Sequence, residues 1–166
     1  MCGTYDGNLL TVDLEKKEII NEATKAHDFS VWYTSFSKDD VNIIYSASDD
    51  ASFKKFDTRI GLSTPVFQNR KHHTAGVTYV RQLKQLCSLK SAEHVLLTGS
   101  YDCTIAEWDE RKLGREPIKS YSTDERSVWD IKINPLAPND WGVASIYDGY
   151  LFDINNSNQS DRKEVD

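Results

Sequence analysis

The stretch SYDCTIAEWDE, residues 100–110, recurs in related form at three other places in the chain. Each copy has an aspartate in a predicted turn, then a short apolar strand, then an aromatic or apolar residue followed by a second aspartate. The closing aspartates, at positions 13, 57, 109 and 153, lie 44, 52 and 44 residues apart. A period of this length is typical of a repeated unit of four short strands rather than of a helical repeat. The other copies are TYDGNLLTVDL from Thr4, SDDASFKKFDT from Ser48 and SIYDGYLFDI from Ser145.

The segments between the copies have the composition of strands. Residues 41–48, 94–100 and 141–146 are short apolar runs that end in small or turn residues, as buried strands do. Residues 30–36, 76–83 and 127–133 are rich in β-branched and aromatic side chains, which strands favour. No segment keeps a helical apolar period over three turns, so the chain is predicted to be all-β. A helix over 79–89 is the weaker alternative.

Composition narrows the function classes. The 166 residues carry a net charge of −6 and 39% apolar residues, which is typical of a globular protein. An acidic surface repels phosphate backbones, so nucleic acid is not an expected partner. No apolar run is long enough for a membrane helix and no signal peptide opens the chain, so no membrane association is expected. The odd, widely spaced cysteines at 2, 87 and 103 are typical of reduced thiols, and we expect a cytoplasmic protein.

The histidines that precede two of the closing pairs make the repeats resemble WD40 blades. Such blades often contain a hydrogen-bonded tetrad of His, Asp, Ser or Thr, and Trp. One repeat has all four members, and the preceding repeat has three, with Phe56 in place of the indole donor. The last repeat has Asp124, Ala144 and Phe152 at these positions, so its network is expected to be largely missing. The predicted tetrad residues are His73, Thr98, Asp102 and Trp108 in the complete set, and His27, Ser46 and Asp50 in the other.

The resemblance implies a partial WD40 β-propeller of about three and a half four-stranded blades, from a ring expected to have seven. The chain is expected to begin inside the third strand of its first blade and to stop after the third strand of its last, with further blades missing. The predicted divisions are 1–25 for the end of a truncated blade, 26–71 and 72–120 for two blades, 121–154 for an incomplete blade, and 155–166 for a disordered polar tail.

A closer resemblance rests on five stretches that occur in order: AHDFSVW (26–32), YSASDDASFKKFDTR (45–59), KHHTAGV (71–77), LLTGSYDCTIAEWDER (96–111) and SVWDIKINP (127–135). Together they resemble the WD-repeat diphthine methyl ester hydrolase family, also called diphthine methyltransferases. The family resemblance implies removal of a methyl ester from a methylated diphthine intermediate on elongation factor 2, in diphthamide biosynthesis. It also implies that no organic cofactor is needed.

Ester hydrolysis requires a base, an attacking group and donors for the oxyanion. The chain has no G-x-S-x-G motif, which excludes a serine on a nucleophile elbow. His27 and His73 are expected to serve the tetrads, so His72 is the candidate catalytic base. The alternative for His72 is an ordinary exposed loop histidine. A metal bound by the histidines is a further alternative, but their spacing fits no zinc pattern and no metal site is predicted.

The trimethylammonium group of diphthine directs attention to aromatic side chains, because aromatic faces and nearby carboxylates recognise quaternary ammonium ions. Trp32, Trp129, Tyr101 and Asp49 are the candidate substrate-binding residues, on loops expected at the top face. Tyr147 and the carboxylates of Asp28, Asp130 and Glu125 are expected on the same face. The alternative for both tryptophans, which hold equivalent places in their repeats, is packing between blades.

An arginine follows two of the closing pairs, in Phe56-Asp57-Thr58-Arg59 and Trp108-Asp109-Glu110-Arg111. These segments resemble the WDxR box of WD40 substrate receptors in cullin-RING ubiquitin ligases, which would make Arg59 and Arg111 contacts for a ligase adaptor. The alternative is an arginine that pairs with its own closing aspartate. Three function classes therefore stay open: the ester hydrolase, the ligase receptor and a protein-interaction scaffold.

Overall fold

The computed structural model describes residues 1–21, 25–85, 93–134, 136–137, 140–146 and 148–153. These residues form antiparallel sheets and one 3₁₀ turn, Leu83–Gln85, so the prediction of an all-β partial WD40 propeller is confirmed. The predicted tail at 155–166, Cys87 and Tyr147 lie outside the described residues. No helix in the described part of the chain is long and apolar enough to cross a membrane.

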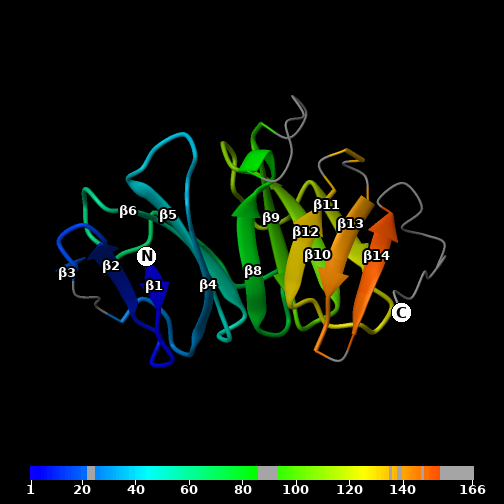
Figure 1. Cartoon of the computed structure of the whole chain (residues 1–166). Helices are drawn as coiled ribbons and strands as arrows, with labels where there is room; N and C mark the ends of the chain where they lie inside the picture. The colour runs from blue at the N-terminus through cyan, green and yellow to red at the C-terminus, as the bar shows by residue number, and fades with distance from the viewer. Residues whose placement is uncertain (22–24, 86–92, 135, 138–139, 147, 154–166) are drawn as a thin grey trace.

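Four sheets follow one another along the chain, each with its strands in sequence order (Figure 1). The first contains three short strands, the second and third contain four each, and the last contains three. Their strands are β1 (Cys2–Gly3), β2 (Leu9–Asp13) and β3 (Glu18–Asn21); β4 (Val31–Phe36), β5 (Ile43–Ser48), β6 (Ser52–Asp57) and β7 (Phe67–Asn69); β8 (Val77–Gln82), β9 (Val95–Ser100), β10 (Thr104–Asp109) and β11 (Lys119–Ser122); and β12 (Asp130–Ile133), β13 (Asp140–Ala144) and β14 (Gly149–Asp153).

The first sheet corrects one detail of the sequence prediction. The chain enters this sheet one strand earlier than expected, because Cys2 and Gly3 pair with Leu10 and Leu9 of β2 before the predicted strand begins. The two-residue strand has no apolar run of its own, so composition did not reveal it. The strand β1 is defined only by its pairing with β2.

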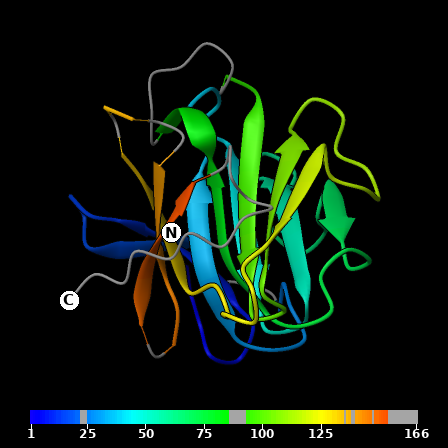
Figure 2. The same cartoon turned by 90° about the vertical axis from the view of Figure 1, so that its right-hand side faces the viewer.

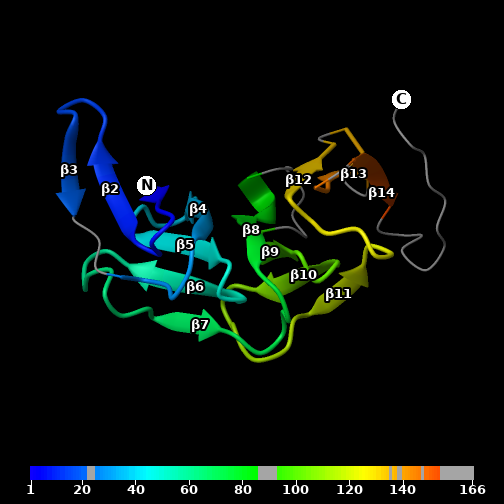
Figure 3. The ribbon, with the colours of Figure 1, turned by 90° about the horizontal axis from the view of Figure 1, so that it is seen from below.

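The sheets are arranged like blades around an arc. Seen from below, β4, β8 and β12 lie along the inner side of the arc, while β7 and β11 lie on its outer side (Figure 3). The turned view in Figure 2 shows β4 and β8, in blue and green, running next to each other, and these two strands are in contact. The first strands of successive blades thus form one continuous inner wall.

Apolar side chains fill the spaces between adjacent sheets. Leu9, Val31 and Phe56 pack between the first and second sheets. The second and third sheets enclose Phe53 and Trp108, whose ring centroids lie 4.9 Å apart. Ile131, Trp141 and other residues of the last sheet pack against the third. Burial of these faces is the main force that stacks the blades.

Candidate functional site

Three aromatic side chains from separate parts of the chain lie against one another, and we call Trp32, Trp129 and Tyr101 the aromatic cluster. Trp32 lies in β4, Trp129 immediately precedes β12, and Tyr101 lies in the turn between β9 and β10. The ring centroid of Trp129 is 5.4 Å from that of Trp32 and 5.6 Å from that of Tyr101. Trp32 and Trp129 contact each other across blades and still remain 39% and 42% exposed.

Local backbone geometry brings the two tryptophans together across β8. The register of β4 against β5 shifts between Val31 and Tyr33, and this irregularity turns Trp32 out of the regular alternation of the sheet. The same shift occurs between Val77 and Tyr79 in β8, which makes Thr78 the counterpart of Trp32. Thr78 is small and buried, so it leaves room for the flanking rings to touch each other.

Hydrogen bonds from Thr78 fix the approach of Trp129. The Thr78 hydroxyl donates to the carbonyl of Val128 at 2.6 Å and to that of Gly99 at 3.2 Å. The backbone N–H of Trp129 donates to the carbonyl of Ala144 at 2.7 Å. The backbone at Val128 and Trp129 is therefore held by hydrogen bonds to the third sheet and to β13. The sequence analysis did not single out Thr78, although its alignment with the two tryptophans was a signal that could have found it.

Asp49 supplies a carboxylate next to the aromatic cluster. It lies in the turn between β5 and β6, and a Cβ added to Gly76 would stand 2.5 Å from its Oδ1 and 3.2 Å from the ring of Tyr101. Burial, and then the negative charge of Asp49, raise the pKa of Tyr101. Asp49 is exposed, and its carboxylate has no hydrogen bond or ion pair with any residue that the structure describes. The structure thus brings the four predicted substrate-binding residues into one neighbourhood.

His72 lies elsewhere in the third blade. Its ring stands edge-on to Trp108 at 5.3 Å and lies 5.0 Å from the ring of His73, while its Nε2 is 3.4 Å from the hydroxyl of Ser120 in β11. Burial, and then the neighbouring His73, lower its pKa, which favours the neutral form that can accept a proton. Its described contacts are on the outer-strand side, so the structure does not bring it to the aromatic cluster.

The tetrad of the third blade links three segments through one histidine. His73 Nδ1 lies 3.1 Å from Asp102, and its Nε2 lies 2.8 Å from the hydroxyl of Thr98. The Trp108 indole donates to that same hydroxyl at 2.9 Å. Burial alone would raise the pKa of the Asp102 carboxyl, but hydrogen bonds from His73 and Thr104 outweigh it and lower the pKa to about 2.

The second blade repeats this network without the indole. His27 Nδ1 lies 3.0 Å from Asp50, and its Nε2 lies 2.7 Å from the hydroxyl of Ser46. Phe56 is fully buried at the tryptophan position and donates nothing. Each blade also has a hydroxyl that the sequence analysis missed, two residues after the aspartate: Ser52 and Thr104 each donate to the adjacent carboxylate at 2.5 Å.

The last sheet contains a different arrangement where the tetrad would stand. Arg126 pairs with Asp148 at 3.0 Å, and the Ser145 hydroxyl donates to the same carboxylate at 2.7 Å. Asp124, at the histidine position, has a left-handed backbone with φ 49°. A salt bridge near the turn is therefore present in the blade that lacks the histidine.

Arg59 and Arg111 adopt the same conformation in consecutive blades. Each guanidinium binds its own closing aspartate through two bonds of 2.7–2.9 Å, Arg59 to Asp57 and Arg111 to Asp109. Arg59 is also 3.1 Å from Asp40. Both arginine side chains are more than half exposed, so they pair internally while remaining accessible on the surface.

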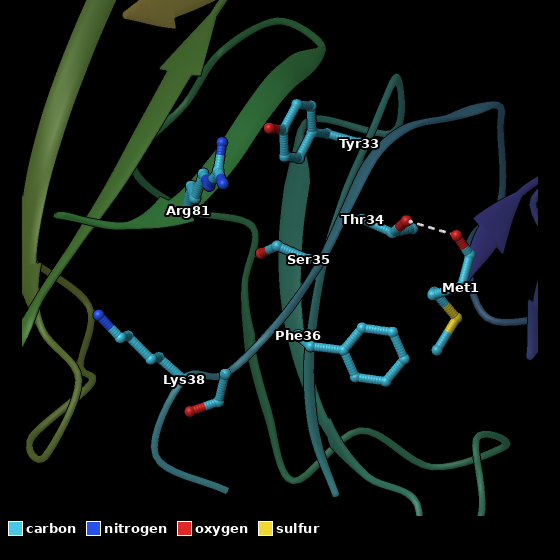
Figure 4. Close-up of a pocket in the computed structure, with 8 residues that line it drawn as sticks. Met1, Tyr33, Thr34, Ser35, Phe36, Lys38 and Arg81 are labelled. Atoms are coloured by element: carbon cyan, nitrogen blue, oxygen red, sulfur yellow. Dashed lines mark hydrogen bonds between the residues drawn. The ribbon is translucent and has the colours of Figure 1, made fainter. Parts of the chain in front are cut away.

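A groove of about 430 Å³ opens beside β4 and is separate from these residues (Figure 4). Tyr33 and Ser35 project toward Arg81 of β8, whereas Thr34 and Phe36 project toward Met1. The Thr34 hydroxyl donates to the Met1 carbonyl at 3.5 Å, and that of Ser35 to the Val80 carbonyl. None of the predicted site residues lines this groove. In the described part of the chain, no group of three or more His, Cys, Asp or Glu residues is placed to hold a metal ion.

Comparison with known proteins connects this geometry to a family. No protein-family profile matches the chain. Diphthine methyltransferase from Mus musculus is 34% identical over 128 residues, which are 75% of this chain and 24% of that protein. The Homo sapiens diphthine methyltransferase is 32% identical over 76% of this chain and 26% of its own length. The chain is related to the WD-repeat diphthine methyltransferases.

Two further relatives show which other proteins the chain resembles. A diphthine methyltransferase homolog from Dictyostelium discoideum is 29% identical over 90% of the chain and 42% of its own length. A homolog of DDB1- and CUL4-associated factor 11 from Caenorhabditis briggsae is 31% identical over 83% of the chain and 24% of its own length. The chain thus spans about a quarter of the mouse and human diphthine methyltransferases, and its similarity extends to a second group of WD40 proteins.

Proposed function

We propose that the protein hydrolyses the methyl ester of methylated diphthine on elongation factor 2, in the cytoplasm, as a step of diphthamide biosynthesis. The observation that carries the proposal is the similarity to diphthine methyltransferases over three quarters of the chain. In the reaction, water adds to the ester carbonyl and methanol leaves, so that a carboxylate and a proton are formed. Hydrolysis of this kind needs no organic cofactor.

Two groups of residues are available to this reaction: one that could bind the substrate, and one that could act as the general base. The aromatic cluster and Asp49 offer a surface for the cationic end of the diphthine side chain. His72 is the proposed base, and its lowered pKa supports that role because the neutral imidazole can accept a proton from water. The ester and the trimethylammonium group of diphthine are attached to the same carbon atom, whereas the structure does not bring His72 to the aromatic cluster. The base and the binding surface are therefore proposed and tested separately.

The proposal is tested with the full-length protein and elongation factor 2 that carries methylated diphthine. We expect intact-protein mass spectrometry to record the loss of one CH₂ equivalent per factor, with release of methanol. His72→Gln should lower the rate by roughly a hundredfold or more if the imidazole is the base, whereas His94→Gln serves as the matched control. Absence of any mass loss would reject the hydrolase, and full activity of His72→Gln would reject only the base.

A second function is supported by the pair Arg59 and Arg111. Two relatives are homologs of a DDB1- and CUL4-associated factor, and both arginines of this chain are exposed in the same conformation. We propose that this pair would contact a ubiquitin-ligase adaptor if the protein acts as a substrate receptor. Replacing both by alanine should abolish co-purification with DDB1, while the exposed Arg115→Ala is the control. Unchanged co-purification of the double variant would exclude this contact.

A further inference from the structure

The groove beside β4 has a basic side and an apolar side. Arg81 and Lys38 line it on the side toward which Tyr33 projects, whereas Phe36 and Met1 lie on the other side of the strand (Figure 4). None of the described residues that line the groove is acidic. The chain as a whole has a net charge of −6, so its surface generally repels anions. Two cations without a lining carboxylate give the groove the opposite electrostatic character.

The carboxylates of neighbouring segments are bound to other groups and do not neutralise Lys38. Asp39, the next residue in the chain, pairs with Lys84 and accepts a hydrogen bond from the Gln82 amide at 3.3 Å. The Gln82 amide also donates to Glu110. The Lys38 ammonium has no ion pair with any residue that the structure describes. Its charge is therefore available to a ligand in the groove.

Two hydroxyl groups of the groove lining can donate to such a ligand. Ser37 is buried, and its oxygen accepts hydrogen bonds from the Asp39 backbone N–H and from the Gln82 amide, each at 3.2 Å. The Ser37 proton has no acceptor among the residues that the structure describes, and neither has that of Tyr33. Buried hydroxyl groups normally have their hydrogen bonds satisfied, so these donors favour an oxygen acceptor from outside the chain.

From this arrangement we propose that the groove binds an organic anion, a carboxylate or a phosphate group carried on an apolar or aromatic body. Arg81 and Lys38 supply the positive charge, the hydroxyls of Tyr33 and Ser37 donate to the anion, and the apolar body lies against Phe36. The volume of about 430 Å³ is sufficient for a small organic ligand. None of the residues proposed for ester hydrolysis lines the groove, so this site is additional to the proposed function.

Four probes separate the charge from the apolar contact: phenyl phosphate, phenylacetate, inorganic phosphate and benzyl alcohol. Each is titrated into the ¹⁵N-labelled full chain and followed by NMR. Phenyl phosphate and phenylacetate should shift the backbone amide resonances of 34–38 and the Nε–H of Arg81, and raised salt should weaken both. Inorganic phosphate should bind roughly threefold to tenfold more weakly than phenyl phosphate, because it lacks the ring. Benzyl alcohol, which has the ring without the charge, should leave these resonances unchanged.

Charge variants test the basic side of the groove. Lys38→Glu should weaken phenyl phosphate by roughly tenfold, because it replaces an attraction by a repulsion. Lys112→Glu is the matched control, since Lys112 is an exposed lysine outside the groove. Arg81→Gln should also weaken phenyl phosphate by roughly tenfold. Arg81 has other contacts in the fold, so thermal unfolding is measured first, and Lys38→Glu decides if Arg81→Gln does not fold.

Phe36→Ala tests the apolar side. It should reduce the affinity for phenyl phosphate to that for inorganic phosphate, and it should leave inorganic phosphate binding as in the parent. Binding of only one of phenyl phosphate and phenylacetate would retain the site and identify the anionic group that it takes. Three outcomes would overturn the proposal: no shift with either aromatic anion, equal shifts with benzyl alcohol, or parental affinity for phenyl phosphate in Lys38→Glu.

Discussion

The second and third blades carry nearly the same polar network but close it with different side chains. In both, a histidine connects an aspartate to a hydroxyl, at 2.7–3.1 Å. In the third blade the hydroxyl of Thr98 also accepts a hydrogen bond from the Trp108 indole, whereas Phe56 in the second blade contributes only packing. The comparison indicates that the histidine and the aspartate are the constant part of the network. At the aromatic position, a buried ring without a hydrogen-bond donor is sufficient.

The largest effect is expected from removing the aspartates. Asp50→Ala should reduce the free energy of unfolding by about 3–5 kcal/mol, because it leaves a buried histidine and several donors without their acceptor. Asp102→Ala should cost somewhat less, since the Asp102 side chain is slightly exposed and that of Asp50 is not. Urea titrations measure both values. Asp49→Ala, which removes an exposed carboxylate one residue away, is the control and should leave the midpoint unchanged.

Acid should act in two steps, first through the histidines and then through the aspartates of both blades. Burial lowers the pKa of His27 below its ordinary 6.5 despite the bond to Asp50, so the unfolded chain binds the proton more readily and stability falls as the pH drops below about 6.5. His72 contributes in the same direction. Asp102 has a pKa of about 2 in the fold against an ordinary 3.8, so its contribution is present above about pH 4 and is lost toward pH 2. We expect that loss to be about 2 kcal/mol.

Stability curves measured from pH 8 to pH 2 by urea unfolding test this order. His27→Gln should flatten the part of the curve just below pH 6.5. Because the hydrogen bond from His27 helps to lower the pKa of Asp50, the contribution of Asp50 below pH 4 should also shrink, while that of Asp102 stays. A curve that is flat between pH 6.5 and pH 4 in the parent protein would contradict the account of His27.

Exchanging the closing rings should destabilise both blades. Trp108→Phe removes the bond to the buried Thr98 hydroxyl and leaves unfilled space, for a cost of about 1–2 kcal/mol. Phe56→Trp would place an indole near Ser46, yet the site is fully buried, so overpacking should cost about 1–3 kcal/mol. Thermal unfolding of both variants measures this. A stabilised Phe56→Trp would show that the second blade has room for the missing indole.

The sequence predicted the repeats well because each copy encodes its own turn aspartate and closing aspartate, and the two complete blades add a histidine. It could not predict the aromatic cluster as a contact. Trp32 and Trp129 are far apart in the chain, and only the inner wall and the register shift near Trp32 bring them together. It also left His72 ambiguous, since one residue of offset from His73 decides which side of the blade the ring faces. Local patterns determine the strands and turns, whereas contacts between blades depend on how the sheets stack.

The smallest expected effect concerns the turns that hold the two aspartates. Ala51 and Cys103 have φ values of 59° and 64°, in the left-handed region that glycine occupies at the equivalent Gly7, with φ 83°. Ala51→Gly and Cys103→Gly should each remove the steric cost of a Cβ in this backbone conformation. Glycine also gives the unfolded chain more conformational freedom, which offsets part of that effect, so the free energy of unfolding should rise by about 0.5 kcal/mol. The reverse change, Gly7→Ala, should destabilise, because its Cβ would lie 2.2 Å from the His27 carbonyl oxygen. Urea unfolding measures the stability of the three variants. If all three substitutions lowered the free energy of unfolding equally, the hydrogen bonds of these turns would outweigh backbone strain.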